Sequence, residues 1–284
     1  MPSAPGVDVS YFPGCSLATT AKENNQSLIE SCRKMGIRLV ELSDWNCCGS
    51  SSAHSIDHRL AFDLACRNLV LAPPGRPLVA ACPSCTLRLK HAQHLLKNDP
   101  AAQERFLQTW GRPFDPDLRI RHFFGLLAEV DFERLPATNG RLRVEMTFAP
   151  YYGCMLNRPT ALRSGSNYYG IMERILGGIG MRSVTWGFAA QCCGTFLSVA
   201  RPDIVTPKVN AIMQGAADAG AECIVTACAM CHMNLEVRCS LKSPVPIFHF
   251  SEMLSLAFGT SNQKEWFSRH LIDPRPLLKS KGLM

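Results

Sequence analysis

The sequence predicts an α/β protein made of two similar lobes, residues 1–140 and 141–284, each with a small parallel sheet flanked by helices. The first reason is that short strand-like segments alternate with segments of helical periodicity, a pattern that favours parallel sheets with right-handed crossovers. The second reason is that the order of segments in the first half recurs in the second. A chain of 284 residues also has the length of two ordinary domains. We therefore expect a duplicated α/β unit with a pseudo-twofold relation between its lobes.

Three strands are expected in the first half, because its apolar runs are short and end at turn residues. They cover residues 7–12, 37–42 and 77–81. Apolar residues at helical spacing predict helices at about residues 20–35, 55–71 and 86–97. Gly36 and the turn Pro73-Pro74-Gly75 mark helix ends. Residues 99–140 would complete the first lobe and lead into the second.

The second half repeats this order of segments. Strands are expected at residues 142–149, 181–185 and 222–227, and helices at about residues 160–176, 203–219 and after Cys231. The repeat also includes Ile120-Arg121-His122-Phe123, which matches Ile247-Phe248-His249-Phe250. The tail after Gly259 is expected either to wrap the body of the protein or to contact a partner.

Ten of the fourteen cysteines form two matched sets of five. In each set a lone cysteine is followed by Cys-Cys-Gly and then, after a gap of similar length, by Cys-x-x-Cys. The first set is Cys15, Cys47, Cys48, Cys82 and Cys85, and the second is Cys154, Cys192, Cys193, Cys228 and Cys231. Every cysteine segment comes just after a predicted strand. Because the carboxyl ends of parallel strands meet at one edge of a sheet, the fold would gather five thiols in each lobe.

The cellular compartment determines whether clustered thiols form disulfides or act as metal ligands or redox groups. No apolar run approaches the length of a bilayer span, and the start at Met1–Gly6 lacks the basic region and apolar core of a signal peptide. We therefore expect a soluble, cytoplasmic protein without a membrane span. In such a reducing compartment, clustered thiols act as metal ligands or redox groups rather than as a disulfide framework.

The charge pattern argues against nucleic acid as a partner. The net charge is +7, but the Lys and Arg residues are dispersed, and no basic stripe is interleaved with aromatic residues for base stacking. Apolar residues make up 46% of the chain and charged residues 19%, as in a well-buried globular protein. A mild positive charge instead suits anionic clusters, acidic substrates or a partner surface.

An iron–sulfur cluster explains five thiols better than zinc does. A structural zinc ion takes four ligands, so one thiol of each set would be left over. A cluster is broader, and adjacent cysteines can reach different irons. Gly49 and Gly194, which follow the Cys-Cys pairs, would let the backbone turn sharply beside such a bulky group. The two Cys-x-x-Cys segments are expected to open helices, whose N-termini favour thiolate and negative cluster charge. Zinc in one lobe stays open as an alternative. A thioredoxin-like role for Cys82-Pro83-Ser84-Cys85 does not explain the coupling to the other cysteines.

The doubled cysteine pattern resembles the CCG domain. Across nearly its full length the chain is similar to the B subunit of heterodisulfide reductase and of the related complexes of sulfur-oxidising organisms. The phrases that carry the resemblance, besides the cysteine sets, are Tyr11-Phe12-Pro13-Gly14-Cys15-Ser16-Leu17, Tyr151-Tyr152-Gly153-Cys154 and Cys231-His232-Met233-Asn234-Leu235-Glu236. The second Cys-x-x-Cys has Ala229 where the first has Pro83, a departure that removes no ligand.

The resemblance implies a catalytic iron–sulfur subunit of a larger oxidoreductase complex. It implies one non-cubane [4Fe-4S] cluster in each set, held by all five cysteines, and a sulfur–sulfur bond made or cleaved between the two clusters. The substrate would be a disulfide, a thiol or protein-bound sulfur, and electrons would pass through an A subunit with flavin and a C subunit with iron–sulfur clusters. Two alternatives remain: an electron-transfer CCG subunit of a dehydrogenase or quinone-linked complex, and a zinc-stabilised scaffold.

Several residues outside the two sets have a functional and a structural interpretation. His232 would either reach the cluster or substrate, or be a helix-start histidine satisfied by the backbone. His122 and His249 are better explained as a duplicated core contact than as metal ligands. His54 and His58 are spaced for one helix face, where solvent exposure is favoured over a metal.

The remaining candidates have a plainer interpretation. Cysteines outside the pattern are expected to be small buried apolar residues, namely Cys32, Cys66, Cys223 and Cys239. Basic residues near the cysteine loops would bind anionic groups of a substrate or be ordinary surface charge, namely Arg88, Lys90, Arg158 and Arg201.

Overall fold

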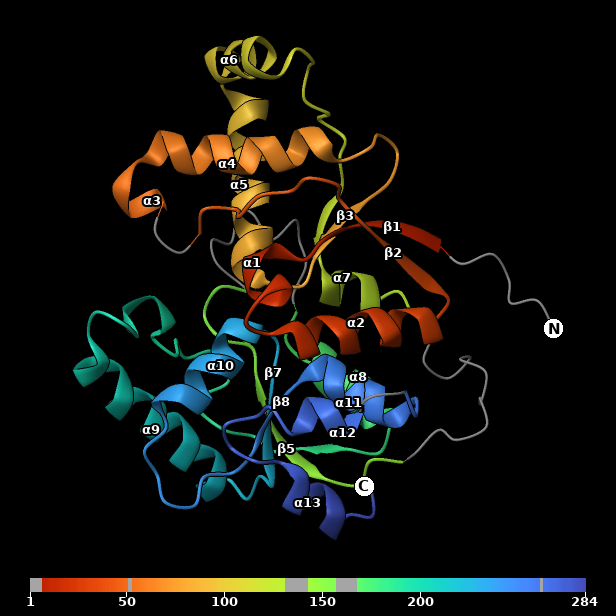
Figure 1. Ribbon diagram of the computed structural model, residues 1–284, viewed down its shortest axis with the longest axis vertical. Coiled ribbons are helices and arrows are strands. Elements are labelled where there is room, and N and C mark those ends of the chain that lie inside the picture. Colours follow the sequence, from red (N-terminus) through yellow and green to blue (C-terminus); the bar gives the residue numbers. More distant parts are fainter. Residues whose placement is uncertain (1–6, 51–52, 131–142, 157–167, 261–262) are drawn as a thin grey trace, which may run out of the picture. The chain divides into compact units, whose positions relative to one another are not determined.

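The computed structural model describes residues 7–50, 53–130, 143–156, 168–260 and 263–284. Two parallel four-stranded sheets flanked by helices confirm the predicted α/β class (Figure 1). The chain divides into two compact units. Unit 1 comprises residues 1–19, 36–129 and 155–168, and unit 2 comprises residues 20–35, 130–154 and 169–284. The predicted lobe boundary near residue 140 lies outside the described residues.

The sheet of unit 1 has the strand order β2-β1-β3-β4, with every pair parallel. The strands are β1 (Val7–Phe12), β2 (Ile37–Glu41), β3 (Leu78–Ala80) and β4 (Ile120–His122). All three residues of β3 are buried, since this strand lies between two others. The fourth strand occupies the Ile120-Arg121-His122 repeat, so this part of the duplication continues the sheet.

Six helices of unit 1 lie within the described residues. They are α1 (Gly14–Ala18), α3 (Ala53–Ile56), α4 (His58–Leu71), α5 (Pro83–Asn98), α6 (Pro100–Trp110) and α7 (Phe123–Leu127). The prediction of one helix over 55–71 is wrong at its start, because α3 and α4 are separate. The Asp57 carboxylate accepts hydrogen bonds from the backbone N–H groups of Arg59 and Leu60 at 2.7 and 3.2 Å. This N-cap begins a new helix and ends the previous one.

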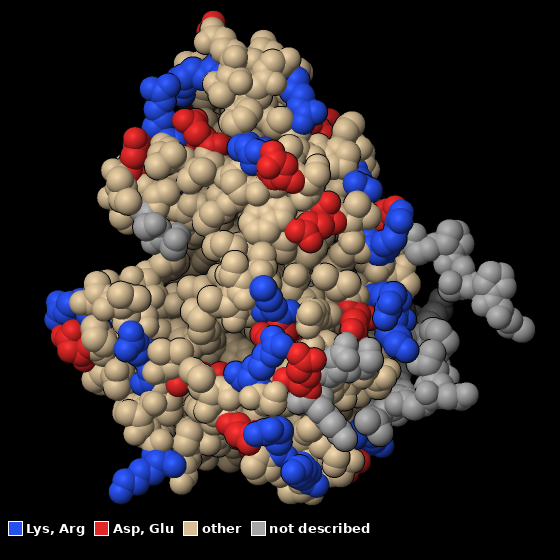
Figure 2. Space-filling view, in the orientation of Figure 1, with Lys and Arg blue, Asp and Glu red and all other residues tan. Residues whose placement is uncertain are grey.

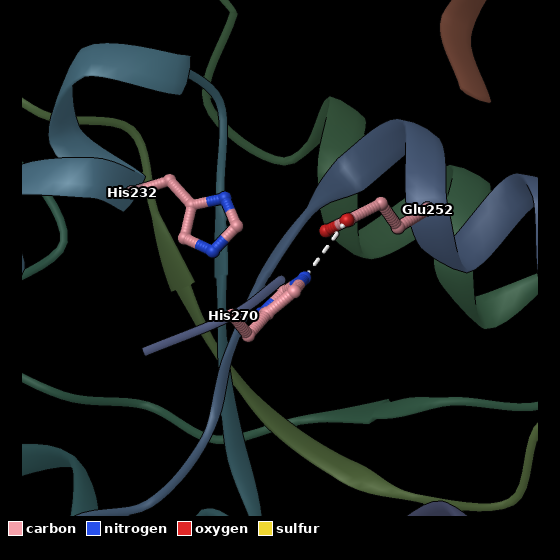
Figure 3. A group of neighbouring side chains, drawn as sticks. All are labelled: His232, Glu252 and His270. Atoms are coloured by element: carbon pink, nitrogen blue, oxygen red, sulfur yellow. Dashed lines mark hydrogen bonds and ion pairs between the residues drawn. The ribbon is translucent and has the colours of Figure 1, made fainter. Parts of the chain in front are cut away.

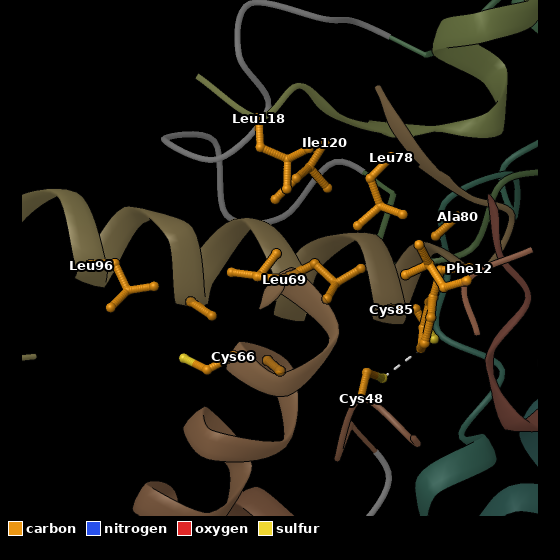
Figure 4. Packing of buried hydrophobic residues seen from close by; sticks show 14 of the residues in the cluster. Phe12, Cys48, Cys66, Leu69, Leu78, Ala80, Cys85, Leu96, Leu118 and Ile120 are labelled. Atoms are coloured by element: carbon orange, nitrogen blue, oxygen red, sulfur yellow. Dashed lines mark hydrogen bonds between the residues drawn. The ribbon is translucent and has the colours of Figure 1, made fainter. Parts of the chain in front are cut away.

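The core of unit 1 packs α4 and α5 against the sheet. Leu69 of α4 and Leu89 of α5 belong to one cluster of buried side chains with strand residues such as Leu78. Figure 4 shows part of this cluster, with Leu69 and Leu78 labelled. Cys48 and Cys85 belong to the same cluster. The cysteine site is therefore built on the edge of the hydrophobic core rather than on a detached loop.

The sheet of unit 2 has the corresponding order β6-β5-β7-β8, again all parallel. The strands are β5 (Thr147–Tyr151), β6 (Arg182–Ser183), β7 (Cys223–Thr226) and β8 (Ile247–His249). Strand β5 starts and ends later in the chain than the predicted strand at residues 142–149. The first residue of that prediction, Leu142, lies outside the described residues. Over the predicted strand 181–185, only two residues pair.

The described helices of unit 2 include one from the first half of the sequence. They are α2 (Lys22–Lys34), α8 (Ile171–Gly177), α9 (Pro202–Asp218), α10 (Ala229–Arg238), α11 (Phe250–Ala257), α12 (Gln263–Phe267) and α13 (Arg275–Ser280), with a short 3-10 helix at Thr195–Leu197. Much of the predicted helix 160–176 lies outside the described residues.

Helix α2 packs on α11, the red and blue helices that lie side by side in Figure 1. Buried hydroxyls join them, with 2.7 Å between the Oγ atoms of Ser27 and Ser251 and 3.1 Å between those of Ser31 and Ser255. Each buried hydroxyl thereby has a partner, as a dry interface requires. These contacts place α2 in the second compact unit.

The C-terminal tail covers α2, which confirms one of the two expectations for it. Trp266 and Phe267 are buried, and the indole Nε1 of Trp266 donates to Gln26 Oε1 at 2.9 Å. None of the described helices combines the length and apolarity of a bilayer span. Figure 2 shows Lys and Arg interspersed with Asp and Glu on the visible face, consistent with dispersed charge.

Candidate metal centres in the two cysteine sets

Each cysteine segment follows a strand of its sheet. In unit 1, Cys15 lies in α1 just after β1, the pair Cys47-Cys48 follows β2, and Cys82 and Cys85 lie between β3 and the first turn of α5. Because these three strands are parallel neighbours, their carboxyl ends bring all three loops to one edge. The corresponding segments of unit 2 follow β5, β6 and β7 in the same order.

The five thiols of the first set form a continuous group. The Sγ atoms of Cys15 and Cys47 lie 3.6 Å apart. Those of Cys48 and Cys85 lie 3.3 Å apart, the contact that is dashed in Figure 4. Cys47 also contacts Cys48, and Cys82 contacts Cys85. The sequence order of the three loops is thus converted into one chain of sulfur contacts.

The second set has the same pattern. The Sγ atoms of Cys193 and Cys231 lie 3.4 Å apart, Cys154 contacts Cys192, and Cys228 contacts Cys231. The backbone of this loop is held as well, since the Asn234 amide donates to the Cys193 carbonyl at 2.9 Å. Two matched groups of five thiols are therefore present, one in each unit.

Burial is graded in the same way in both sets. The second cysteine of each Cys-Cys pair and both cysteines of each Cys-x-x-Cys are buried, namely Cys48, Cys82, Cys85, Cys193, Cys228 and Cys231. Cys15 is exposed, and Cys47, Cys154 and Cys192 are half-buried. Each site thus has three deep thiols and two thiols at its rim.

The deep thiols differ in how readily they lose a proton. Hydrogen bonds with Cys47 and Cys85 lower the pKa of Cys48, and the hydrogen bond with Cys231 lowers the pKa of Cys193. The same contacts have the opposite effect on the partners, because they raise the pKa of Cys85 and Cys231. Since a thiolate is the form that binds metal, Cys48 and Cys193 are the first candidates to receive one.

Helix termini add to this effect. Cys82 is the N-cap of α5 and Cys228 the N-cap of α10, so the predicted start of a helix at each Cys-x-x-Cys is confirmed. Cys85 and Cys231 lie in the first turns of these helices. The positive end of the helix dipole therefore faces both sulfur groups and favours negative charge on them.

A glycine before the lone cysteine gives each sulfur group its space. Gly14 has φ +74°, and a Cβ there would lie 3.0 Å from the Sγ of Cys85. Gly153 has φ +68°, and a Cβ there would lie 3.3 Å from the Sγ of Cys231. Neither glycine was identified from the sequence as a site residue, although both precede the lone cysteine of the repeat.

Gly49 and Gly194 hold the turns after the Cys-Cys pairs. Both have positive φ, but a Cβ would meet the protein rather than sulfur: Ala53 and Leu64 in the first case and Val205 in the second. Their role beside a cluster remains a prediction.

The sulfur separations fit metal ligation. They exceed the ~2.05 Å of a disulfide bond and approach the ~3.7 Å between two thiolates on one tetrahedral ion with ~2.3 Å bonds. Five thiols exceed the four ligands of zinc. Both sets therefore fit a larger, cluster-type group.

Two of the predicted histidines have structural partners. His122 Nδ1 accepts the Phe124 N–H at 3.2 Å, and its Nε2 lies 3.1 Å from the Ala81 carbonyl oxygen. His249 Nδ1 lies 2.7 Å from the Ser251 hydroxyl. These caps agree with the duplicated core contact that the repeat predicts.

His54 and His58 do not share a helix, because the break at Asp57 separates them. His58 is exposed and His54 half-buried. His232 is buried, and its ring contacts the Asn24 amide at Nδ1 and the Glu236 carboxylate at Nε2 rather than the backbone.

Three of the four remaining cysteines, Cys32, Cys66 and Cys223, are buried, and Cys239 is half-buried. Burial raises the pKa of Cys66 to about 12, which makes it an inert apolar residue. Of the basic candidates, Arg201 is ion-paired with Asp203 at 2.7 Å, while Arg88 and Lys90 are half-buried on α5. Arg158 lies outside the described residues.

A sheet of order 2-1-3-4 with five converging cysteines, present twice, defines a class of cysteine-rich α/β domains. The family model of the CCG cysteine-rich domain matches residues 9–90 and 148–236. The chain therefore belongs to the CCG family and contains its domain in two copies, as the cysteine pattern predicts.

Sequence relatives match almost the whole chain. One is the 8-methylmenaquinol:fumarate reductase membrane anchor subunit of Wolinella succinogenes, 27% identical over 95% of this chain and 99% of that protein. Another is the B subunit of a ferredoxin/F420H2-dependent CoB-CoM heterodisulfide reductase of Methanosarcina acetivorans, 26% identical over 89% of this chain and 90% of the relative. Homology to the B subunit of heterodisulfide reductase, an oxidoreductase, is thereby confirmed.

Among solved structures, a hypothetical protein from Helicobacter pylori has a similar fold. The TM-score is 0.72 over 95% of this chain and 53% of that chain, at 14% sequence identity. This likeness concerns the fold alone.

Proposed function

We propose that this protein is the iron–sulfur subunit of a heterodisulfide-reductase-like oxidoreductase complex that makes or cleaves a sulfur–sulfur bond at its clusters. Each set of five cysteines would hold one non-cubane [4Fe-4S] cluster. The substrate would be a disulfide, a thiol or protein-bound sulfur. Electrons would be exchanged with an A subunit that carries flavin and a C subunit that carries iron–sulfur clusters.

The observation that carries this proposal is the graded burial of the two sets. Cys15 is exposed and Cys47, Cys154 and Cys192 are half-buried, so one side of each site is accessible to an external sulfur atom. A bound iron–sulfur cluster supplies electrons and a soft metal that stabilises a thiolate. An accessible rim is what a substrate needs, whereas electron transfer alone does not require it.

The chain itself contributes charge and space to this chemistry. The N-termini of α5 and α10 stabilise negative charge at Cys82, Cys85, Cys228 and Cys231. Gly14 and Gly153 keep the backbone clear of the deepest sulfur atoms. The apolar core beneath excludes water from the buried side, so that only the rim is open to exchange.

A second candidate is an electron-transfer subunit of a quinone-linked complex. The specific observation in its favour is the relative from Wolinella succinogenes, whose name describes a membrane anchor subunit of a menaquinol:fumarate reductase and which the chain matches over 99% of its length. In this alternative the clusters would only conduct electrons, and neither would bind substrate sulfur.

The test is metal analysis and EPR spectroscopy of the full chain, prepared without oxygen. The proposal expects about eight iron atoms with matching acid-labile sulfide per chain, as two four-iron clusters require. Addition of a thiol under mild oxidation should change the EPR spectrum.

An unchanged spectrum with full iron content would favour the electron-transfer candidate. A zinc-stabilised scaffold, the third possibility, would instead give about two zinc ions per chain and no acid-labile sulfide.

A further inference from the structure

A buried group of charged side chains lies in unit 2 beside the second cysteine set. His232 and Glu236 lie one turn apart on α10, Glu252 lies on α11, and His270 comes from the tail after α12. All four side chains are more than nine-tenths buried, with exposed fractions of 8, 7, 0 and 4% respectively. Figure 3 shows the imidazoles of His232 and His270 and the Glu252 carboxylate directed toward one another.

Three polar atoms in this group converge without forming hydrogen bonds. His232 Nε2 and His270 Nδ1 lie 3.4 and 3.1 Å from the same oxygen, Glu236 Oε1. Both nitrogens lie within ion-pair distance of this oxygen, but none of the three atoms has a hydrogen bond of acceptable geometry within the described part of the chain. Buried polar atoms without a partner are costly, so their convergence calls for a further group.

The opposite atom of each of these side chains is fixed by a partner. His232 Nδ1 lies 3.1 Å from Asn24 Nδ2, and His270 Nε2 lies 3.0 Å from Glu252 Oε1. Binding of an ion at His232 Nε2 requires the Asn24 amide to be turned over, so that Nδ1–H donates to the Asn24 oxygen. Glu236 Oε2 accepts the Leu271 N–H at 3.1 Å. Metal-binding histidines are typically oriented in this way, by a carboxylate or amide on the nitrogen that does not bind the ion.

We propose that unit 2 binds a divalent metal ion of the zinc class through His232 Nε2, His270 Nδ1 and Glu236 Oε1. Glu252 orients His270, and because His232, Glu252 and His270 each have a ligand atom within 4.8 Å of the others, its carboxylate is available as a further ligand. Ligands of a tetrahedral zinc ion at bond lengths of ~2.1 Å lie about 3.4 Å from one another, close to both observed separations. Imidazole and carboxylate are donors that zinc commonly takes. The cysteines of the second set are not needed for this site.

The charges also balance with such an ion. Two buried carboxylates and two neutral imidazoles carry a charge of −2, which one divalent cation compensates. A single imidazolium at His270 would leave one buried negative charge over. Burial alone would lower the pKa of His270, but the carboxylates of Glu252 and Glu236 raise it to about 10. This raised pKa shows that the negative charge of the two carboxylates favours a cation beside them.

A pocket of about 340 Å³ reaches the group and offers a way in for the ion. Its wall includes Asn24, Met233, Trp266 and Arg269. The guanidinium of Arg269 does not oppose a cation, because it is paired with Glu23 at 2.6 Å and with Glu265 at 2.5 Å. The bound ion would join the tail to α10, the helix that begins at Cys228.

The experiment compares zinc and iron in the full chain carrying its iron–sulfur clusters, after incubation with Zn²⁺ and removal of loose ions. Wild type should hold about one zinc ion per chain. His270→Gln and Glu236→Gln should each lose it, while the exposed His94→Gln should keep it. Iron and acid-labile sulfide should stay unchanged in all variants, which separates this proposal from the one for the cysteine sets.

Replacement of Zn²⁺ by Co²⁺ gives a second readout that does not depend on the variants. In the difference spectrum between the Co²⁺-loaded and the Zn²⁺-loaded chain, which cancels the absorption of the iron–sulfur clusters, nitrogen and oxygen ligation gives weak visible bands without the strong near-ultraviolet band of thiolate ligation. A strong thiolate band, retention of zinc in both variants, or a wild type that takes up no zinc would each overturn the proposal.

Discussion

The sulfur atoms of Cys48 and Cys85 lie 3.3 Å apart, across the gap between the loop after β2 and the first turn of α5. The pair joins two segments that the sequence separates by the helices α3 and α4 and the strand β3. Its counterpart in unit 2, Cys193 with Cys231, has nearly the same separation of 3.4 Å. In both pairs the cysteine of the Cys-Cys-Gly segment has the lowered pKa. The duplicated sequence thus reproduces the chemistry of the thiols as well as their order.

Cys48→Ser should remove the cluster of the first set and leave that of the second. We expect the iron and acid-labile sulfide per chain to fall to about half of the wild-type values, since the two sets are independent ligand groups. Cys66→Ser is the matched control, because Cys66 is buried in the same core cluster but outside the pattern. Full iron content in Cys48→Ser would contradict the ligand role.

Gly14→Ala should also impair the first set, although it changes no ligand. The new Cβ would lie 3.0 Å from the Cys85 sulfur. Gly75→Ala is the control, since Gly75 has the same φ of +74° but no neighbouring atom within 4 Å. Both variants bear the backbone cost of roughly 1 kcal/mol for a left-handed alanine. Only Gly14→Ala should lose iron, and equal iron contents in the two variants would refute this explanation.

The serine contacts between α2 and α11 should stabilise unit 2. Ser27→Ala should lower the free energy of unfolding by about 1 kcal/mol, because the Ser251 hydroxyl loses one of its buried partners and keeps only His249 Nδ1 and the Asn24 carbonyl. In the double variant with Ser251→Ala the two losses should not add, which a double-mutant cycle by chemical denaturation can measure. The exposed Ser280→Ala serves as a control and should change the stability by less than roughly 0.5 kcal/mol. Additive losses would show that the two hydroxyls act separately.

His122 should make unit 1 less stable as the pH falls. Burial lowers its pKa to about 4, below the ordinary value of 6.5, so the folded state holds the neutral imidazole. Between pH 6.5 and 4 the unfolded chain binds more protons, and the stabilisation present above pH 6.5 is lost on acidification. From pH 7.5 to 5.5 we expect a loss of about 1 kcal/mol.

The measurement for His122 is the unfolding free energy at both pH values, in wild type and in His122→Gln. Glutamine keeps a donor and an acceptor but does not titrate. The wild type should show the steeper dependence on pH. Identical slopes would mean that another group governs the acid sensitivity.

Much of the site could be predicted because it depends on local order. Strand, loop and cysteine follow one another within a few residues, and parallel strands bring their carboxyl ends to one edge. The positions of Cys15, Cys47 and Cys82 after three strands therefore sufficed to predict a group of thiols. The helix starts at Cys82 and Cys228 were predictable for the same reason.

Other features depended on contacts that no local pattern reveals. The break between α3 and α4 follows from the two hydrogen bonds of the Asp57 carboxylate, which the helical spacing of the flanking apolar residues concealed. Gly14 and Gly153 are site residues only because the sulfur atoms of Cys85 and Cys231 lie against them.

The sequence by itself determined the α/β class, the duplication and the two matched sets of cysteines. All three follow from hydrophobic periodicity and from the spacing of residues along the chain. Only the tertiary structure decided that α2 packs with α11 in the second unit and that His270 meets Glu236 and Glu252. Such long-range contacts depend on which buried surfaces and polar groups complement each other in space. The local sequence around residues that are far apart in the chain does not reveal these contacts.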